Sequence, residues 1–117
     1  LFSAPASPLV QPRNIAGGTL VSFASALLWH VLSESHVPKW LAVVLAPATA
    51  ISGMQLLGVS HPPAGAVSLI FITGGPRITD PGWMFLAAPL ALGNVVAVLL
   101  ASLINNLSPK RQYPMFW

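Results

Sequence analysis

The seven charged residues of this chain lie outside its long apolar stretches, and this placement constrains the fold more than any other feature. Charged residues make up 6% of the chain, against roughly 25% in soluble domains, where they solvate the surface. Three stretches contain no Lys, Arg, Asp or Glu: Ile15–Ser33, Trp40–Gly75 and Pro81–Pro109. This pattern predicts an integral, multi-pass membrane protein whose solvent is the lipid bilayer.

The composition further limits the class of protein to which this chain can belong. The chain has 117 residues, enough for one domain, and 55% of them are apolar. It has no cysteine, which excludes disulfides and thiolate chemistry. Its net charge is +3, but the basic residues are dispersed, so we expect no nucleic-acid partner. We expect no metal and no cofactor. The chain opens without Met or a basic leader, and we interpret it as a fragment of a longer protein.

The apolar stretches predict an all-α fold, a small multi-pass transmembrane bundle with three long helices and one short one. A helix rises 1.5 Å per residue, and a bilayer core is about 30 Å thick. The 14 residues from Pro62 to Gly75 reach only about 21 Å, so this helix is either a short crossing or re-entrant. The expected order is a loop, four helices and an interfacial tail, over residues 1–14, 15–33, 40–60, 62–75, 83–107 and 108–117 within a single domain, 1–117.

Small and polar side chains within these helices predict how they pack. Small residues recur every four positions on the first two helices, where they either allow close helix contact or reflect the commonness of alanine in membranes. They are Gly18, Ser22, Ala26, Ala42, Ala46 and Ala50. Gln55 and Asn94 are uncharged polar groups in apolar helices, so both should face the bundle interior. There they would line a substrate path or bond to a neighbouring helix.

Two helix starts are candidates for an anion site, because helix N-termini present free N–H groups and partial positive charge. If all four helices cross, both starts lie on the same side of the membrane. The residues are Arg13, Asn14, Gly17 and Gly18 at the first start, and His61, Pro62, Pro63 and Gly65 at the second. The alternative is that the prolines only end one helix and begin another, while Arg13 contacts lipid phosphate.

Several motifs together resemble the HPP family of integral membrane proteins. They are SPLVQPRNIAGG, the Met-bearing SGMQ, HPPAGA and, near the end, INNL with a Tyr-Pro tail. The resemblance implies four transmembrane helices, and His61-Pro62-Pro63 as the triplet that names the family. Some plant members look like nitrite transporters of the chloroplast envelope, whereas many have only an inferred transport role. The sequence differs in lacking a further helix before Ser7 and in Gly18-Thr19, where many members have Gly-His.

These features predict a transporter or channel for a small inorganic anion such as nitrite, acting as a homo-oligomer. Arg13 would supply charge, the two helix starts would donate hydrogen bonds, and His61 would bind or gate in a pH-dependent way. A non-transporting scaffold or regulatory subunit is the alternative. Enzymatic catalysis is not expected, because the only carboxylates, Glu34 and Asp80, lie in turns. The membrane would be a plasma or inner membrane, or a plastid envelope, with the tail on the cytosolic-type side.

Overall fold

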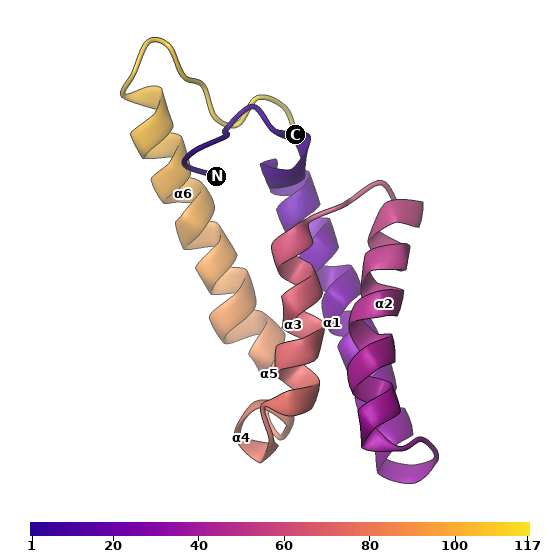
Figure 1. Ribbon diagram of the computed structural model, residues 1–117. Coiled ribbons are helices and arrows are strands. Elements are labelled where there is room, and N and C mark those ends of the chain that lie inside the picture. Colours follow the sequence, from indigo (N-terminus) through magenta and orange to yellow (C-terminus); the bar gives the residue numbers. More distant parts are fainter.

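The computed structural model describes all 117 residues, and they form helices and loops without any strand (Figure 1). The elements in order are a 3-10 turn over Pro8–Val10, α1 (Pro12–Ser35), α2 (Lys39–Leu56), α3 (Pro62–Thr73), α4 (Pro76–Thr79), α5 (Trp83–Phe85), a π-helical segment over Leu86–Ala91, and α6 (Leu92–Asn106). This confirms the predicted all-α fold with three long helices and one short one.

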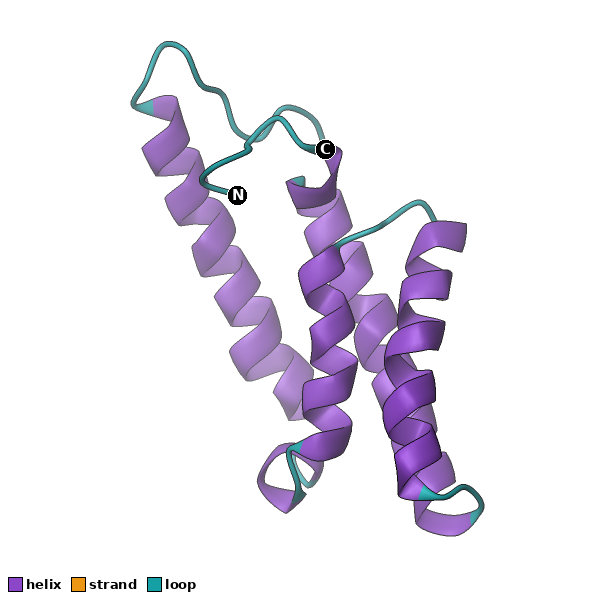
Figure 2. Ribbon diagram, in the orientation of Figure 1, coloured by secondary structure: helices purple, strands orange, loops and turns teal.

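The helices run alternately between two ends of the molecule, and the loops gather at those ends (Figure 2). Both chain termini and the starts of α1 and α3 lie at one end, which we call the terminal end. α1, α2 and the continuous helix Trp83–Asn106 are each long and apolar enough to cross a membrane. α3 has 12 residues, about 18 Å, yet runs from the terminal end to the opposite end. This direction favours a short crossing over a re-entrant helix.

The core lies among α1, α2 and α3, which pack against one another through their small residues. All six positions of the two small-residue stripes are buried, so these stripes are helix contacts. Close approach lets polar groups bond across helices: the Ser25 hydroxyl donates to the Ala46 carbonyl at 2.8 Å, and the Ser22 hydroxyl to the Ala64 carbonyl. In a bilayer such packing and bonding replace the hydrophobic force that holds soluble bundles.

α6 is set apart from this core. It continues the helix of the π-helical segment before it and touches α1 sparsely. Most of its large apolar side chains are exposed: Leu92, Val95, Val96, Leu99, Leu100, Leu103 and Ile104. Such a surface is what a lipid-facing helix requires. The π-helical segment contains Pro89, whose missing N–H and bulky ring disturb regular α-helical bonding.

Two predicted helix boundaries were wrong, for identifiable reasons. α2 was expected to reach residue 60 but ends at Leu56, because Gly58 adopts a left-handed φ of 64°. The Val59 N–H then bonds to the Met54 carbonyl at 2.9 Å and the Gly58 N–H to the Gln55 carbonyl at 3.2 Å, a Schellman motif. α1 starts at Pro12 rather than at residue 15, since proline fits the first helical position and Gln11 precedes it as the N-cap residue.

Candidate functional site

The start of α1 is held in place by Gln11. Its side chain is fully buried, and its amide nitrogen donates to the carbonyls of Pro5 at 2.8 Å and Ser7 at 3.0 Å. Gln11 thus folds the N-terminal loop back over the helix start instead of capping it. Because Pro12 has no N–H and Ile15 already donates to the Gln11 carbonyl, the N–H groups of Arg13 and Asn14 remain without helical partners.

Asn14 connects the start of α1 to the loop between α2 and α3. It lies inside the first turn of α1, and its amide nitrogen donates outward. The acceptors are the Pro8 carbonyl at 3.0 Å and the Ser60 carbonyl at 3.3 Å, 46 residues away in the chain. The structure therefore brings the two predicted helix starts together at the terminal end.

Gly17 and Gly18 make this approach possible. A Cβ built on Gly17 would lie 2.8 Å from a Val59 methyl carbon, and one on Gly18 would lie 2.7 Å from the His61 Cβ. Both distances are shorter than side chains tolerate, so the loop packs directly on the α1 backbone. A Cβ built on Gly65 would cause no such clash, since the nearest atom, an Ile51 side-chain carbon, would be 3.4 Å away. The two glycines of α1 therefore let the α2–α3 loop pack against the helix, and no cavity remains between the loop and α1.

His61 precedes α3 as its N-cap residue and is 8% exposed. Its Nδ1 donates to the Leu9 carbonyl at 2.9 Å, which leaves Nε2 as an acceptor in the neutral ring. Burial lowers the pKa of His61 below its ordinary value of about 6.5, and the bond to Leu9 opposes this only in part. The lowered pKa favours the neutral ring at pH 7. That His61 binds or gates in a pH-dependent way stays a prediction.

The start of α3 offers fewer donors than the sequence suggested. Pro62 and Pro63 have no N–H, and the Ala64 N–H already donates to the His61 carbonyl at 2.9 Å. The prolines favour the helix start but remove the groups that would bind an anion. The free donors at the terminal end are consequently those of α1, beside the exposed Arg13.

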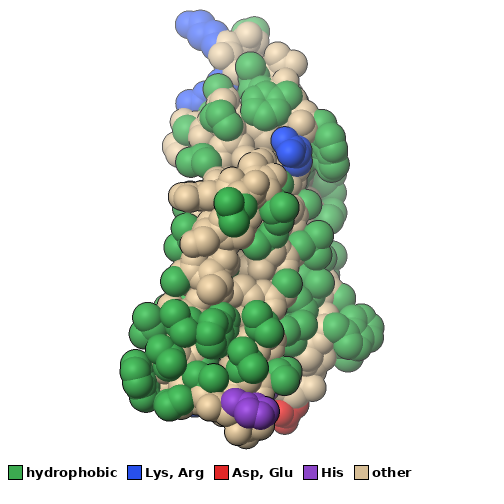
Figure 3. Space-filling view, turned by 90° about the vertical axis from the view of Figure 1, so that its right-hand side faces the viewer, with side chains coloured by type: hydrophobic (Ala, Val, Ile, Leu, Met, Phe, Trp, Pro, Cys, Tyr) green, Lys and Arg blue, Asp and Glu red, His purple; other side chains and the backbone are tan.

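Charge is divided between the two ends of the molecule. The terminal end carries Arg13, Lys110 and Arg111, and no carboxylate. Glu34, near the end of α1, and Asp80, between α4 and α5, both lie at the opposite end, together with Lys39 and Arg77. In the space-filling view, Lys and Arg gather toward the terminal end, while an acidic side chain appears at the other (Figure 3). The apolar flank between them matches a membrane-crossing surface.

The two predicted path-lining residues have different outcomes. Gln55 is exposed, which contradicts the expectation that it faces the interior. Its neighbour Met54 occupies the buried side of α2, so the helical turn points Gln55 outward. Asn94 is half-buried, and its amide nitrogen donates to the Thr19 hydroxyl at 2.9 Å. This bond joins α6 to α1 within the apolar region.

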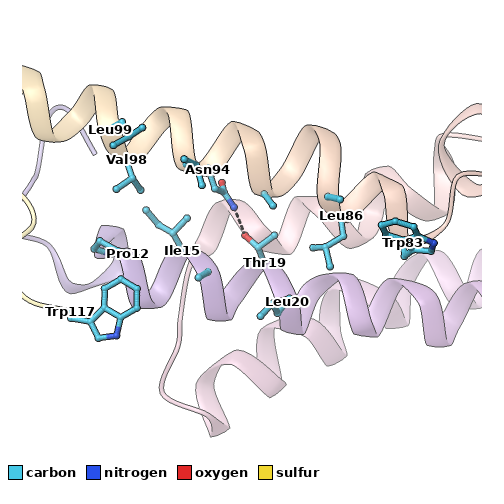
Figure 4. A pocket seen from close by; sticks show the side chains of 14 residues that line it. Pro12, Ile15, Thr19, Leu20, Trp83, Leu86, Asn94, Val98, Leu99 and Trp117 are labelled. Carbon is cyan, nitrogen blue, oxygen red and sulfur yellow. Dashed lines mark hydrogen bonds between the residues drawn. The ribbon is translucent and has the colours of Figure 1, made fainter.

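Asn94 also lines a cleft between α1 and α6 with a volume of about 530 Å³ (Figure 4). Side chains from α1 and from the α5–α6 helix form its walls, with Trp117 near one end and Trp83 near the other. Neither Arg13 nor His61 lines this cleft. It is a separate feature from the junction of the two helix starts.

Sequence reasoning missed the role of the C-terminal tail. Tyr113 was assigned to an interfacial aromatic belt, but it is fully buried, and its hydroxyl donates to the Val10 carbonyl at 2.8 Å. Asn106 bonds to both backbone groups of Tyr113, and the Met115 N–H donates to the Gln11 side-chain oxygen at 3.0 Å. The tail thus fastens the end of α6 to the start of α1. No local sequence pattern predicts these contacts between the tail and the start of α1. Their only signal is the presence of two polar residues, Gln11 and Asn106, that can form them.

Membrane-length helices, segregated charge and an apolar flank define a small multi-pass helical membrane protein. Within that class the chain belongs to the HPP transmembrane region family, which matches residues 1–114. Two transmembrane proteins of Dictyostelium discoideum are similar to the whole chain, 36% and 34% identical over 118 residues. The chain spans only 38% and 41% of the length of these relatives. No solved structure matches it.

Proposed function

We propose that this protein is a transporter or channel for a small inorganic anion such as nitrite, and that the terminal end is the mouth that receives the anion. The observation that carries the proposal is the separation of charge. Arg13, Lys110 and Arg111 lie at the terminal end with no Asp or Glu beside them, whereas at the other end both Glu34 and Asp80 balance Lys39 and Arg77. A mouth lined by one sign of charge raises the local concentration of the opposite ion.

Arg13 is the residue that we expect to meet the anion first. Its guanidinium is exposed, and the unpaired N–H groups of Arg13 and Asn14 lie beside it at the positive end of the α1 dipole. His61 takes a different role in this proposal from the one its residue type suggested. As a neutral, buried ring bonded to Leu9, it fixes the loop over α1 and does not supply charge.

The proposed path requires more than one chain. α6 stands apart from the other helices, and the cleft beside it is apolar, so one copy encloses no polar route across the membrane. We therefore include a homo-oligomer in the proposal, in which path-lining groups come from several copies. The proposal contains no catalytic step, because both carboxylates lie away from the cationic mouth.

A non-transporting scaffold or regulatory subunit is the second candidate, and one observation favours it. The space beside Gly17 and Gly18 is filled by Val59 and His61, so these glycines form a packing contact instead of a binding cavity. In this alternative the two motifs hold the bundle together, and partner binding occurs elsewhere.

The test is nitrite uptake into proteoliposomes that contain the full-length protein. Arg13→Gln should reduce uptake about tenfold or more, the effect of losing a charge-assisted bond. Arg77→Gln is the matched control, because Arg77 is also exposed but lies at the opposite end. Equal nitrite uptake by both variants would show that Arg13 does not contribute to the proposed mouth. Absence of uptake by the unaltered protein, together with a stably co-purifying partner, would favour the scaffold.

A further inference from the structure

The α1–α6 cleft is built for an apolar occupant. Of its 14 lining residues, 11 are hydrophobic. The polar side chains among them, Thr19 and Asn94, already bond to each other. The other polar side-chain groups in the lining are the Asn94 amide oxygen and the indole N–H groups of Trp83 and Trp117, so most of the wall offers water no partner. Its volume of about 530 Å³ falls within the roughly 300–1,000 Å³ of known ligand pockets.

The cleft runs along much of the apolar thickness of a bilayer. On α1 its lining runs from Pro12 to Leu20, eight helical rises or about 12 Å, and on the facing helix from Trp83 to Leu99, sixteen rises or about 24 Å. A hydrocarbon core is about 30 Å thick. The cleft therefore begins near the terminal end and extends along the bilayer normal, as an acyl chain entering from that end would.

A basic pocket lies at the same end of the molecule. It is formed between the N-terminal loop and the tail, with a volume of about 560 Å³, and its lining includes Lys110 and Arg111 but no carboxylate. Asn106, Ser108 and Gln112 add polar groups to its wall. The tail connects the two hollows, because Met115 lines the basic pocket and Trp117, two residues later, lines the cleft.

We propose that these two hollows together bind one anionic phospholipid. The phosphate headgroup contacts Lys110 and Arg111, and an acyl chain lies in the cleft between α1 and α6. Basic residues near the membrane surface attract anionic lipids, which supplies the selectivity, and the apolar cleft supplies the affinity for the chain. Lys110 and Arg111 also add to the charge of the proposed mouth, but this inference requires no anion transport, and its tests measure lipid binding instead of anion uptake.

A second copy of the chain fits the same surface less well. A copy in the same orientation would bring its own Lys110 and Arg111 to this end and would offer no carboxylate to balance them. Like charges at close range repel, whereas a phosphate group neutralises both cations. The charge complementarity therefore favours lipid as the occupant.

Tryptophan quenching by brominated lipids tests this proposal, because Trp83 and Trp117 both line the cleft. The background variant Trp29→Phe/Trp40→Phe leaves only these two reporters. In mixed vesicles at equal mole fraction, brominated phosphatidylglycerol should bind about tenfold more strongly than brominated phosphatidylcholine. Lys110→Gln/Arg111→Gln should abolish that preference. Native mass spectrometry of the unaltered protein from the same lipid mixture provides a second measurement that needs no tryptophan substitution.

A matched pair of substitutions tests the acyl-chain part. Ala87→Phe places a ring in the cleft and should reduce quenching by the anionic lipid severalfold. Ala88→Phe is the control, because Ala88 is exposed and does not line the cleft. Equal quenching by both brominated lipids would overturn the proposal, and so would unchanged quenching by the anionic lipid in Ala87→Phe. Displacement of the lipid by soluble glycerol phosphate would show a free-anion pocket only, and would also contradict it.

Discussion

Gly18 is the position where the proposed junction of α1 with the α2–α3 loop is most sensitive to substitution. A Cβ at this position would lie 2.7 Å from the His61 Cβ, 3.0 Å from the Val59 carbonyl oxygen and 3.1 Å from the Met54 sulfur. Two of these atoms belong to the backbone or are rigidly attached to it, so they cannot move aside cheaply. Gly18→Ala should therefore force the loop away from α1, at the roughly 1–3 kcal/mol typical of overpacking.

Gly93→Ala is the control for the intrinsic effect of the same change. Gly93 also lies in a helix, but nothing approaches its added Cβ within 4 Å. Alanine favours a helix over glycine by about 1 kcal/mol, and this gain applies to both variants. The free energy of unfolding, from denaturant titration in detergent, should thus be about 1–3 kcal/mol lower for Gly18→Ala than for Gly93→Ala. Equal stability of the two variants would refute the close approach at Gly18.

Two further predictions concern the terminal end. Because burial lowers the pKa of His61, the unfolded chain takes up a proton before the folded protein does as the pH falls below about 6.5. Stability should therefore decrease from about pH 6.5 down to the lowered pKa and then level off, and His61→Gln should remove this component of a thermal-stability profile. Tyr113→Phe removes the hydroxyl that donates to the Val10 carbonyl, and should lower the free energy of unfolding by about 0.5–1.5 kcal/mol. A Tyr113→Phe protein as stable as the parent would show that this bond does not fasten the tail.

Much of the fold was predictable because a lipid bilayer permits few kinds of backbone structure. The absence of charge from three stretches predicted the membrane-crossing helices, and the spacing of small residues predicted which faces of α1 and α2 meet. The start of α3 at Pro62 was also predicted, since proline has no N–H to lose in the first turn. These are local or periodic signals, and a single sequence contains them.

The site was less predictable, because its contacts join residues far apart in the chain. His61 bonds to Leu9, 52 residues away, and Tyr113 bonds to Val10, 103 residues away. Residue type alone suggested an ordinary pKa for His61 and an interfacial Tyr113, but burial lowers the pKa of His61 and places the Tyr113 side chain inside the structure. Gln55 shows the opposite error: a polar residue in an apolar helix was expected inside, yet it lies near the helix end, where exposure carries a smaller cost.

The central claim is that the starts of α1 and α3 share one side of the membrane, opposite the two carboxylates. The chain contains no cysteine, so single cysteines can be placed and labelled with a membrane-impermeant maleimide. Cysteines at Ala6, Leu57 and Gln112 should all react from one side of oriented vesicles, and cysteines at Ser35 and Asp80 only from the other. Labelling of position 57 from the same side as positions 35 and 80 would contradict the arrangement on which the proposed mouth depends.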